Sequence, residues 1–99
     1  MKYSYSFLDI AQQEYEEALI WYLEKSPAAA EGFVKAVDAA LNLICDNPKG
    51  WRNEYEDYHE LGLKKYPFNL IYSIEQDEMQ VVIKSVYHQS RNPTEKYKK

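Results

Sequence analysis

The sequence has a single cysteine, Cys45, and lacks a long apolar run. One cysteine excludes an internal disulfide and a zinc site built from several cysteines. Because Cys45 lies within an apolar pattern of helical spacing, we expect it to be a small buried residue. No apolar run approaches the ~20 residues that a membrane-spanning helix needs. The short polar N-terminus also lacks a signal-peptide pattern, so the sequence predicts a cytoplasmic protein.

Positive charge is scarce over the whole chain, which carries a formal net charge of −4. This deficit disfavours broad, non-specific binding to nucleic acid. The charge is uneven, because residues 1–50 carry a net charge of −4 and residues 84–99 carry a net charge of +4. We expect the basic end to contact phosphate or an acidic protein segment. For Lys98 and Lys99 we favour a solvated, frayed terminus that begins near residue 93.

The chain has only two histidines, His59 and His88, and they lie far apart without the spacing of metal ligands. We therefore expect no metal site and no cofactor, and we place His59 at the surface among acidic neighbours. Tyrosine, by contrast, is abundant, with ten in 99 residues. Because its side chain is amphipathic, most rings should border a small core and some should lie where a partner binds.

Apolar periodicity predicts one domain over residues 1–99 that begins with a short strand at 2–7. Apolar residues at helical spacing predict two helices, at 8–25 and 27–47. Ser26 is expected to cap the second helix, and a proline follows it at the first helical position. The connection is so short that the helices should form an antiparallel hairpin.

Three strands are predicted after residue 57, the first near 58–66. The other two, at 68–74 and 79–87, form a hairpin around a polar tetrapeptide. The acidic, aromatic stretch 51–60 is the least regular, and we interpret it as a loop that leads into a strand. The order is β-α-α-β-β-β. It predicts a two-layer α+β fold, with the helix hairpin packed on one face of a four-stranded, mainly antiparallel sheet. The other face is where we expect function.

Several short motifs follow one another along most of the chain. They are Trp21-Tyr22, Phe33, Asn47-Pro48, the segment 63–68 followed by Ile71-Tyr72, and the segment 86–93. In order and spacing they resemble the RelE/ParE superfamily of bacterial type II toxin–antitoxin toxins. The last segment is similar to the His-x-x-Arg-Asp-Pro ending common on the ParE-like side, with Asn92 in place of the aspartate.

The resemblance implies a toxin that a cognate antitoxin protein neutralises in a hetero-oligomer, with a homodimer as another possible assembly. ParE-like members bind DNA gyrase and have no hydrolytic centre. RelE-like members are endoribonucleases that cut messenger RNA on the ribosome. The ending of the chain and its few basic residues favour the gyrase target. The alternatives are a RelE-like nuclease and a non-toxic protein-binding module of the same fold, and they differ in whether the protein is an enzyme.

The candidate site residues gather in the C-terminal hairpin and the segment after it. We place Arg91 first and His88 second, with Lys64 and Lys84 behind them, as binding groups. Each has a structural alternative as well. His88 could donate a hydrogen bond to a nearby backbone carbonyl, and Arg91 could pair with Glu60 or Asp57.

If RNA is the substrate, the same residues take catalytic roles. His88 then serves as general acid or base, Arg91 clamps the phosphate, and Lys64 offsets charge in the transition state. Tyr72 or Tyr87 could stack a splayed base. This chemistry requires all these groups to converge on one face of the sheet.

Overall fold

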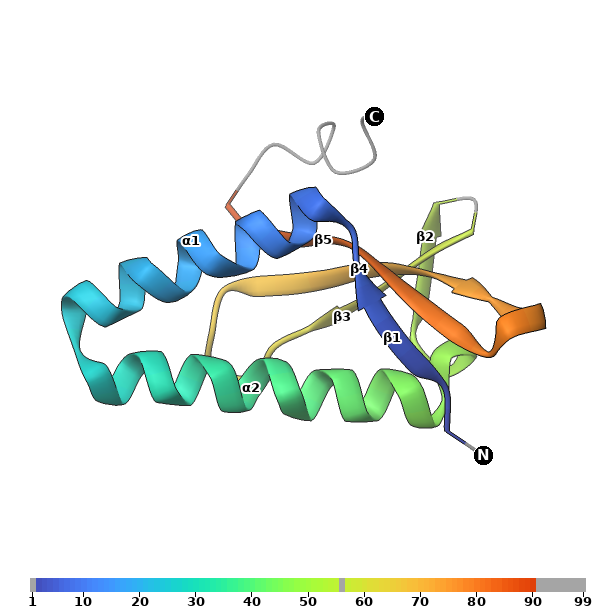
Figure 1. The fold of residues 1–99 in the computed structure, drawn as a ribbon, viewed down its shortest axis with the longest axis horizontal. Coiled ribbons are helices and arrows are strands. Elements are labelled where there is room, and N and C mark those ends of the chain that lie inside the picture. Colours follow the sequence, from blue (N-terminus) through green and yellow to red (C-terminus); the bar gives the residue numbers. More distant parts are fainter. Residues whose placement is uncertain (1, 56, 91–99) are drawn as a thin grey trace.

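The structure, a computed structural model, describes residues 2–55 and 57–90 of the chain (Figure 1). Besides helices and strands, it contains two short 3₁₀ turns: η1 (Pro48–Gly50) follows the second helix, and η2 (Gln76–Glu78) connects the last two strands. The regular elements are β1 (Ser4–Phe7), α1 (Asp9–Lys25), α2 (Pro27–Asp46), β2 (Arg52–Tyr55), β3 (Tyr58–Gly62), β4 (Phe68–Glu75) and β5 (Gln80–His88). The predicted α+β class is confirmed.

Ser26 alone separates the two helices. Its side chain accepts a hydrogen bond from the Ala29 N–H at 3.3 Å, and Pro27 occupies the first helical position, as predicted. The chain therefore reverses within one residue, and the helices lie antiparallel (Figure 1). Both helices match the predicted ranges to within one residue at each end.

The sheet has five strands in the order β1-β5-β4-β3-β2, one more than the sequence predicts. The additional strand, β2, lies in the stretch interpreted as a loop. It was missed because its charged residues do not alternate with apolar ones; its strand structure comes from antiparallel pairing with β3, where Arg52 lies opposite Glu60. Strand β1 is parallel to β5 and the other pairs are antiparallel, so the mainly antiparallel sheet is confirmed.

Strand β3 ends at Gly62, earlier than the predicted end near residue 66. Lys64 and Lys65 therefore lie in the loop between β3 and β4, and both are exposed. Lys65 has a φ of 69°, a left-handed conformation that cannot continue a strand. The predicted strand near 58–66 is therefore too long at its C-terminal end.

The predicted hairpin is present as β4 and β5, with a β-bulge in β5. Ile71 lies opposite Ser85 and Tyr72 lies opposite Ile83, so Lys84 is the extra residue. The bulge changes the alternation of the strand, and the core residues of β5 are spaced by two and then by three: Val81, Ile83 and Val86. This spacing explains why both faces of the strand look apolar in the sequence.

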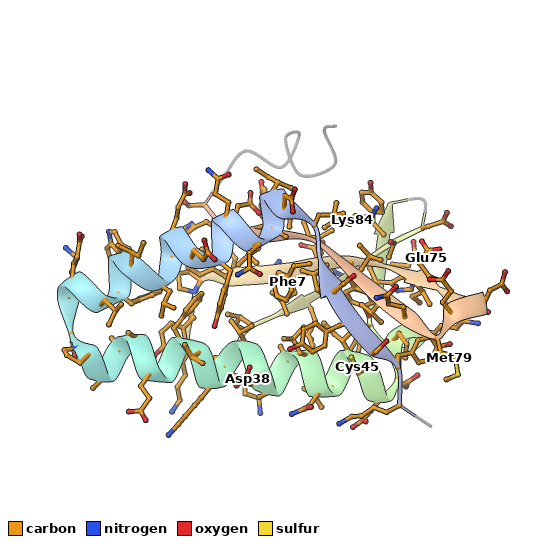
Figure 2. The ribbon with its side chains drawn as sticks, viewed as in Figure 1. Phe7, Asp38, Cys45, Glu75, Met79 and Lys84 are labelled. Carbon is orange, nitrogen blue, oxygen red and sulfur yellow. The ribbon has the colours of Figure 1, made fainter. Side chains whose placement is uncertain are left out.

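The core lies between the helices and one face of the sheet. The helices contribute Ala11, Ala18, Phe33, Val37, Ala40, Leu41 and Ile44, and β4 and β5 contribute Leu70, Tyr72, Val81, Ile83 and Val86. Cys45 is buried near the end of α2, as predicted, and its carbonyl accepts the Tyr3 N–H at 3.0 Å (Figure 2). Within the described residues, neither helix has the length and apolar character needed to cross a membrane.

Candidate functional site

A surface groove lies where α1 passes the paired ends of β4 and β5, and we call it the α1 groove. Its cavity volume is about 450 Å³. The walls include two carboxylates, three aromatic rings and one imidazole: Glu14, Glu17, Trp21, Tyr22, Phe68 and His88. An open, largely apolar hollow with a few polar groups is typical of a binding site.

Aromatic contacts build the floor of the α1 groove. Tyr22 packs against Phe33, with ring centroids 5.1 Å apart, and meets Phe68 at 6.4 Å. Trp21 meets Tyr22 edge-on at 5.0 Å and remains 53% exposed. The interior rings fix the position of Tyr22, while the indole of Trp21 forms an apolar rim that faces solvent.

His88 lies on the strand side of the α1 groove, where its ring packs edge-on against Phe68 at 4.9 Å. Its Nδ1 accepts hydrogen bonds from the backbone N–H of Ser90 at 3.1 Å and from the Ser90 hydroxyl at 2.7 Å. A backbone N–H can only donate, so Nδ1 is unprotonated and Nε2 carries the proton. Of the roles considered for His88, donation to a carbonyl through Nδ1 is therefore excluded, because this atom accepts from Ser90.

Glu14 forms the opposite wall and joins α1 to β5. Its Oε1 accepts the Val86 backbone N–H at 2.9 Å and the Ser85 hydroxyl at 2.8 Å. Both donors follow the β-bulge at Lys84 and lie beyond Ile83, the last residue of β5 that pairs with β1. Glu14 thus provides the acceptor for a backbone donor of β5 past the end of β1.

On the opposite face of the sheet lies a polar network centred on Glu60, which is only 3% exposed. Glu60 Oε2 accepts a hydrogen bond from Asn69 Nδ2 at 2.8 Å, and Asn69 Oδ1 accepts one from Gln89 Nε2 at 2.9 Å. Arg52 lies 3.8 Å from Glu60 Oε1. Sequence reasoning missed this network because the Arg52 contact depends on the unpredicted strand β2 and the other contacts depend on the pairing of β3 with β4. Glu60 was considered only as a partner of Arg91, which lies outside the described residues, as does the tail from residue 93.

Among the described residues, the structure does not bring Lys84 and His88 to one face of the sheet. Lys84 lies on the face away from the helices, with its Nζ 6.0 Å from the ring centroid of Tyr58. His88 lies on the helix side of the sheet, and Lys64 lies in the β3–β4 loop.

The two tyrosines expected to stack a base are both interior. Tyr72 is fully buried and its hydroxyl donates to the Pro48 carbonyl at 2.6 Å, while Tyr87 is 2% exposed. Neither ring is therefore open to a splayed base. Burial, and next the proximity of Cys45, raise the pKa of Tyr72, which keeps its hydroxyl protonated as a donor.

His59, which we expected at the surface, is only partly exposed. Its ring is half-buried and stacks on Tyr72 at 5.4 Å, and its Nδ1 donates to the Trp51 carbonyl at 3.1 Å. Because a carbonyl only accepts, this imidazole holds its proton on Nδ1. Among the described residues, no cluster of three or more His, Cys, Asp or Glu side chains could hold a metal ion.

Comparison with known families identifies the class of the protein. The profile of a family described as the ParE toxin of the type II toxin–antitoxin system parDE matches residues 5–93. Because this match covers most of the chain, the protein belongs to the ParE toxin family, within the RelE/ParE superfamily of toxin–antitoxin toxins. A comparison with curated protein sequences gives no match.

Solved structures share the fold at low sequence identity. The chromosomal ParDE system of P. aeruginosa matches with a TM-score of 0.72 and 14% identity, over 88% of this chain and 96% of that chain. The isolated E. coli RelE toxin matches with a TM-score of 0.64 and 16% identity, over 93% and 89%. The RelBE2 toxin–antitoxin complex of Mycobacterium tuberculosis matches with a TM-score of 0.57 and 21% identity, over 89% and 99%.

Proposed function

We propose that this toxin inhibits growth by binding DNA gyrase and that a cognate antitoxin protein neutralises it. The match to the ParE family over residues 5–93 supports a gyrase-type target. Structural similarity to the ParDE and RelBE2 toxin–antitoxin systems supports an antitoxin partner.

The observation that carries the gyrase proposal is the separation of Lys84 from His88. Cleavage of RNA by its own 2′-hydroxyl needs a base, an acid and cations around one phosphate. Here Lys84 lies on one face of the sheet and His88 lies on the other, while Lys64 is in a loop. Basic groups spread over two faces suit contacts with a large protein surface better than they suit a hydrolytic centre.

The proposed binding groups are therefore Lys84 and His88 from the described residues, with Lys64 at the margin and Arg91 carried over from the sequence. Tyr72 and Tyr87 take no part in direct contact, because both are buried. The protein acts as an inhibitor by association and requires no catalytic residue of its own.

Induction of the gene in a bacterial host, with and without the protein of the adjacent gene, tests this proposal. We expect growth arrest, loss of plasmid supercoiling and intact transcripts, with growth restored by the adjacent protein. Cleaved transcripts with normal supercoiling would instead establish a RelE-like nuclease. Continued growth, with supercoiling and transcripts both unchanged, would indicate a non-toxic binding module.

A further inference from the structure

Helix α1 exposes large apolar side chains beside the α1 groove. Ile20, Trp21 and Leu23, all in its last two turns, are each more than half exposed. Trp21 lines the groove, whereas Ile20 does not. An exposed aromatic side chain at the rim of a hollow, as Trp21 provides here, is a feature of protein-binding surfaces.

The carboxylates and ammonium groups near the groove are divided between its lining, which is acidic, and its rim, where Lys25 lies over Trp21. Among the described residues that line the groove, Glu14 and Glu17 are the charged side chains, and no lysine or arginine is present. Glu14 is held against β5 by Ser85 and Val86, so its charge has a fixed position. Glu17 is exposed at the rim, where its Oε2 accepts a hydrogen bond from Gln13 at 3.1 Å. A basic group placed beside the exposed Glu17 carboxylate would gain from its charge.

The rim also binds a cation within the chain itself. Lys25 Nζ lies 4.9 Å from the ring centroid of Trp21, a cation–π distance. The indole therefore combines apolar contact area with affinity for positive charge. A partner that presents an apolar side chain next to a basic one would match both properties.

We propose that the α1 groove receives a segment of the antitoxin that places an apolar side chain between Trp21 and Phe68 and a lysine or arginine beside Glu17. This inference rests on the proposed toxin–antitoxin pairing and specifies its chemistry. The contact differs from the acidic segment expected to meet the basic residues 84–99, because the groove attracts the opposite charge. It makes Glu17 and Trp21 residues that determine partner specificity.

The test measures binding of the full-length protein to the protein of the adjacent gene by isothermal titration calorimetry. Glu17→Lys should weaken binding at least about tenfold, because it places two like charges together and loses an attraction. The matched control is Glu16→Lys. Glu16 lies on the same helix, is exposed and accepts a hydrogen bond from Gln12 at 2.9 Å, but it does not line the groove. We expect this control to change affinity by less than about twofold.

A second pair of variants tests the apolar half of the contact. Trp21→Ala should weaken binding at least about thirtyfold, the scale of an aromatic anchor at an interface, whereas Ile20→Ala should have a small effect. Circular dichroism and thermal unfolding establish that each variant is folded. A charge-swapped antitoxin, with its basic residue changed to glutamate, should recover affinity for Glu17→Lys.

The outcomes separate this inference from the proposed function. If the wild-type protein does not bind the adjacent protein, both fail. If it binds and the Glu17 and Glu16 variants behave alike, only the groove assignment is overturned. Stronger binding by Glu17→Lys would indicate that the basic end of this chain occupies the groove. A dimer of the protein alone that Glu17→Lys disrupts would indicate a second copy as the occupant. Either of these results overturns the proposal that an antitoxin segment occupies the α1 groove.

Discussion

Glu14 accepts the backbone N–H of Val86 at 2.9 Å, across 72 positions of sequence. This hydrogen bond joins the middle of α1 to the strand that ends at His88, and so holds the two walls of the α1 groove together. The bond lies just past Ile83, where the parallel pairing of β5 with β1 ends.

The Glu14 contact predicts a measurable loss of stability. Glu14→Ala removes the acceptor of one backbone and one side-chain donor and should lower the free energy of unfolding by about 1–3 kcal/mol. Glu14→Gln keeps a side-chain oxygen that can accept a hydrogen bond, so it should lower the free energy of unfolding by less. Urea denaturation followed by circular dichroism gives the values, with exposed Glu16→Ala as the control. Equal effects at the two positions would show that the contact contributes nothing.

A close contact between α2 and the β3–β4 loop predicts a coupled pair. Tyr66 donates its hydroxyl hydrogen to the Ala29 carbonyl at 3.0 Å, and a Cβ at Gly32 would collide with that hydroxyl oxygen. Gly32→Ala should therefore destabilise the protein by about 1–3 kcal/mol despite the better helix propensity of alanine. In a Tyr66→Phe background the same substitution should cost much less. A double-mutant cycle measures this coupling, and additive effects would contradict the contact.

Burial of Tyr72 predicts a fall in stability at alkaline pH. Its folded pKa is raised above the ordinary 10.0, so above pH 10 the unfolded chain binds fewer protons than the folded one. Stability is then complete below pH 10 and declines as the pH rises, by up to about 1.4 kcal/mol per pH unit for this group. Tyr72→Phe should be less stable at pH 8, because the Pro48 carbonyl loses its donor.

Between pH 8 and pH 11, however, Tyr72→Phe should lose less stability than the wild-type protein. Some loss remains in the variant, because burial also raises the pKa of Tyr15, Tyr22 and Cys45. Urea denaturation of both proteins at the two pH values measures the difference. Identical losses would mean that the Tyr72 hydroxyl titrates equally in the folded and unfolded chains.

The proposed binding groups predict loss of inhibition without loss of fold. Lys84→Ala and Arg91→Ala should each raise the concentration needed to inhibit gyrase by about tenfold, the scale of one charged contact at an interface. Lys35→Ala is the matched control, since Lys35 is exposed on α2 and pairs with Glu31 of the same helix. Lys84 lies over Tyr58, so thermal unfolding must accompany its assay. An unchanged inhibitory concentration for both variants would remove them from the target surface.

The helices were predictable because their signals are local. Apolar spacing, the Ser26 cap and Pro27 together define α1 and α2 to within a residue. Strand β2, which the sequence did not predict, had no such signal. It is stabilised by pairing with β3 at the edge of the sheet, and its own residues show no strand pattern. The bulge at Lys84 could not be predicted either, because it depends on the register between β4 and β5.

The candidate site was less predictable, because exposure is a tertiary property. Tyr72 and Tyr87 looked like binding residues in the sequence, and the fold buries both. His88 was predicted as a site residue from its place at the end of a strand. Trp21, which lines the same groove, was noted only as part of a family resemblance and not as a site residue. The helical spacing of Glu14, Glu17 and Trp21 was the available signal for a shared face.

The most direct test of the account is ATP-dependent supercoiling by purified gyrase in the presence of the purified protein. We predict that the protein inhibits supercoiling at a concentration that saturates its binding to gyrase, and that equimolar antitoxin restores the activity. Undiminished supercoiling at saturating toxin, together with cleavage of messenger RNA on ribosomes, would contradict the gyrase assignment.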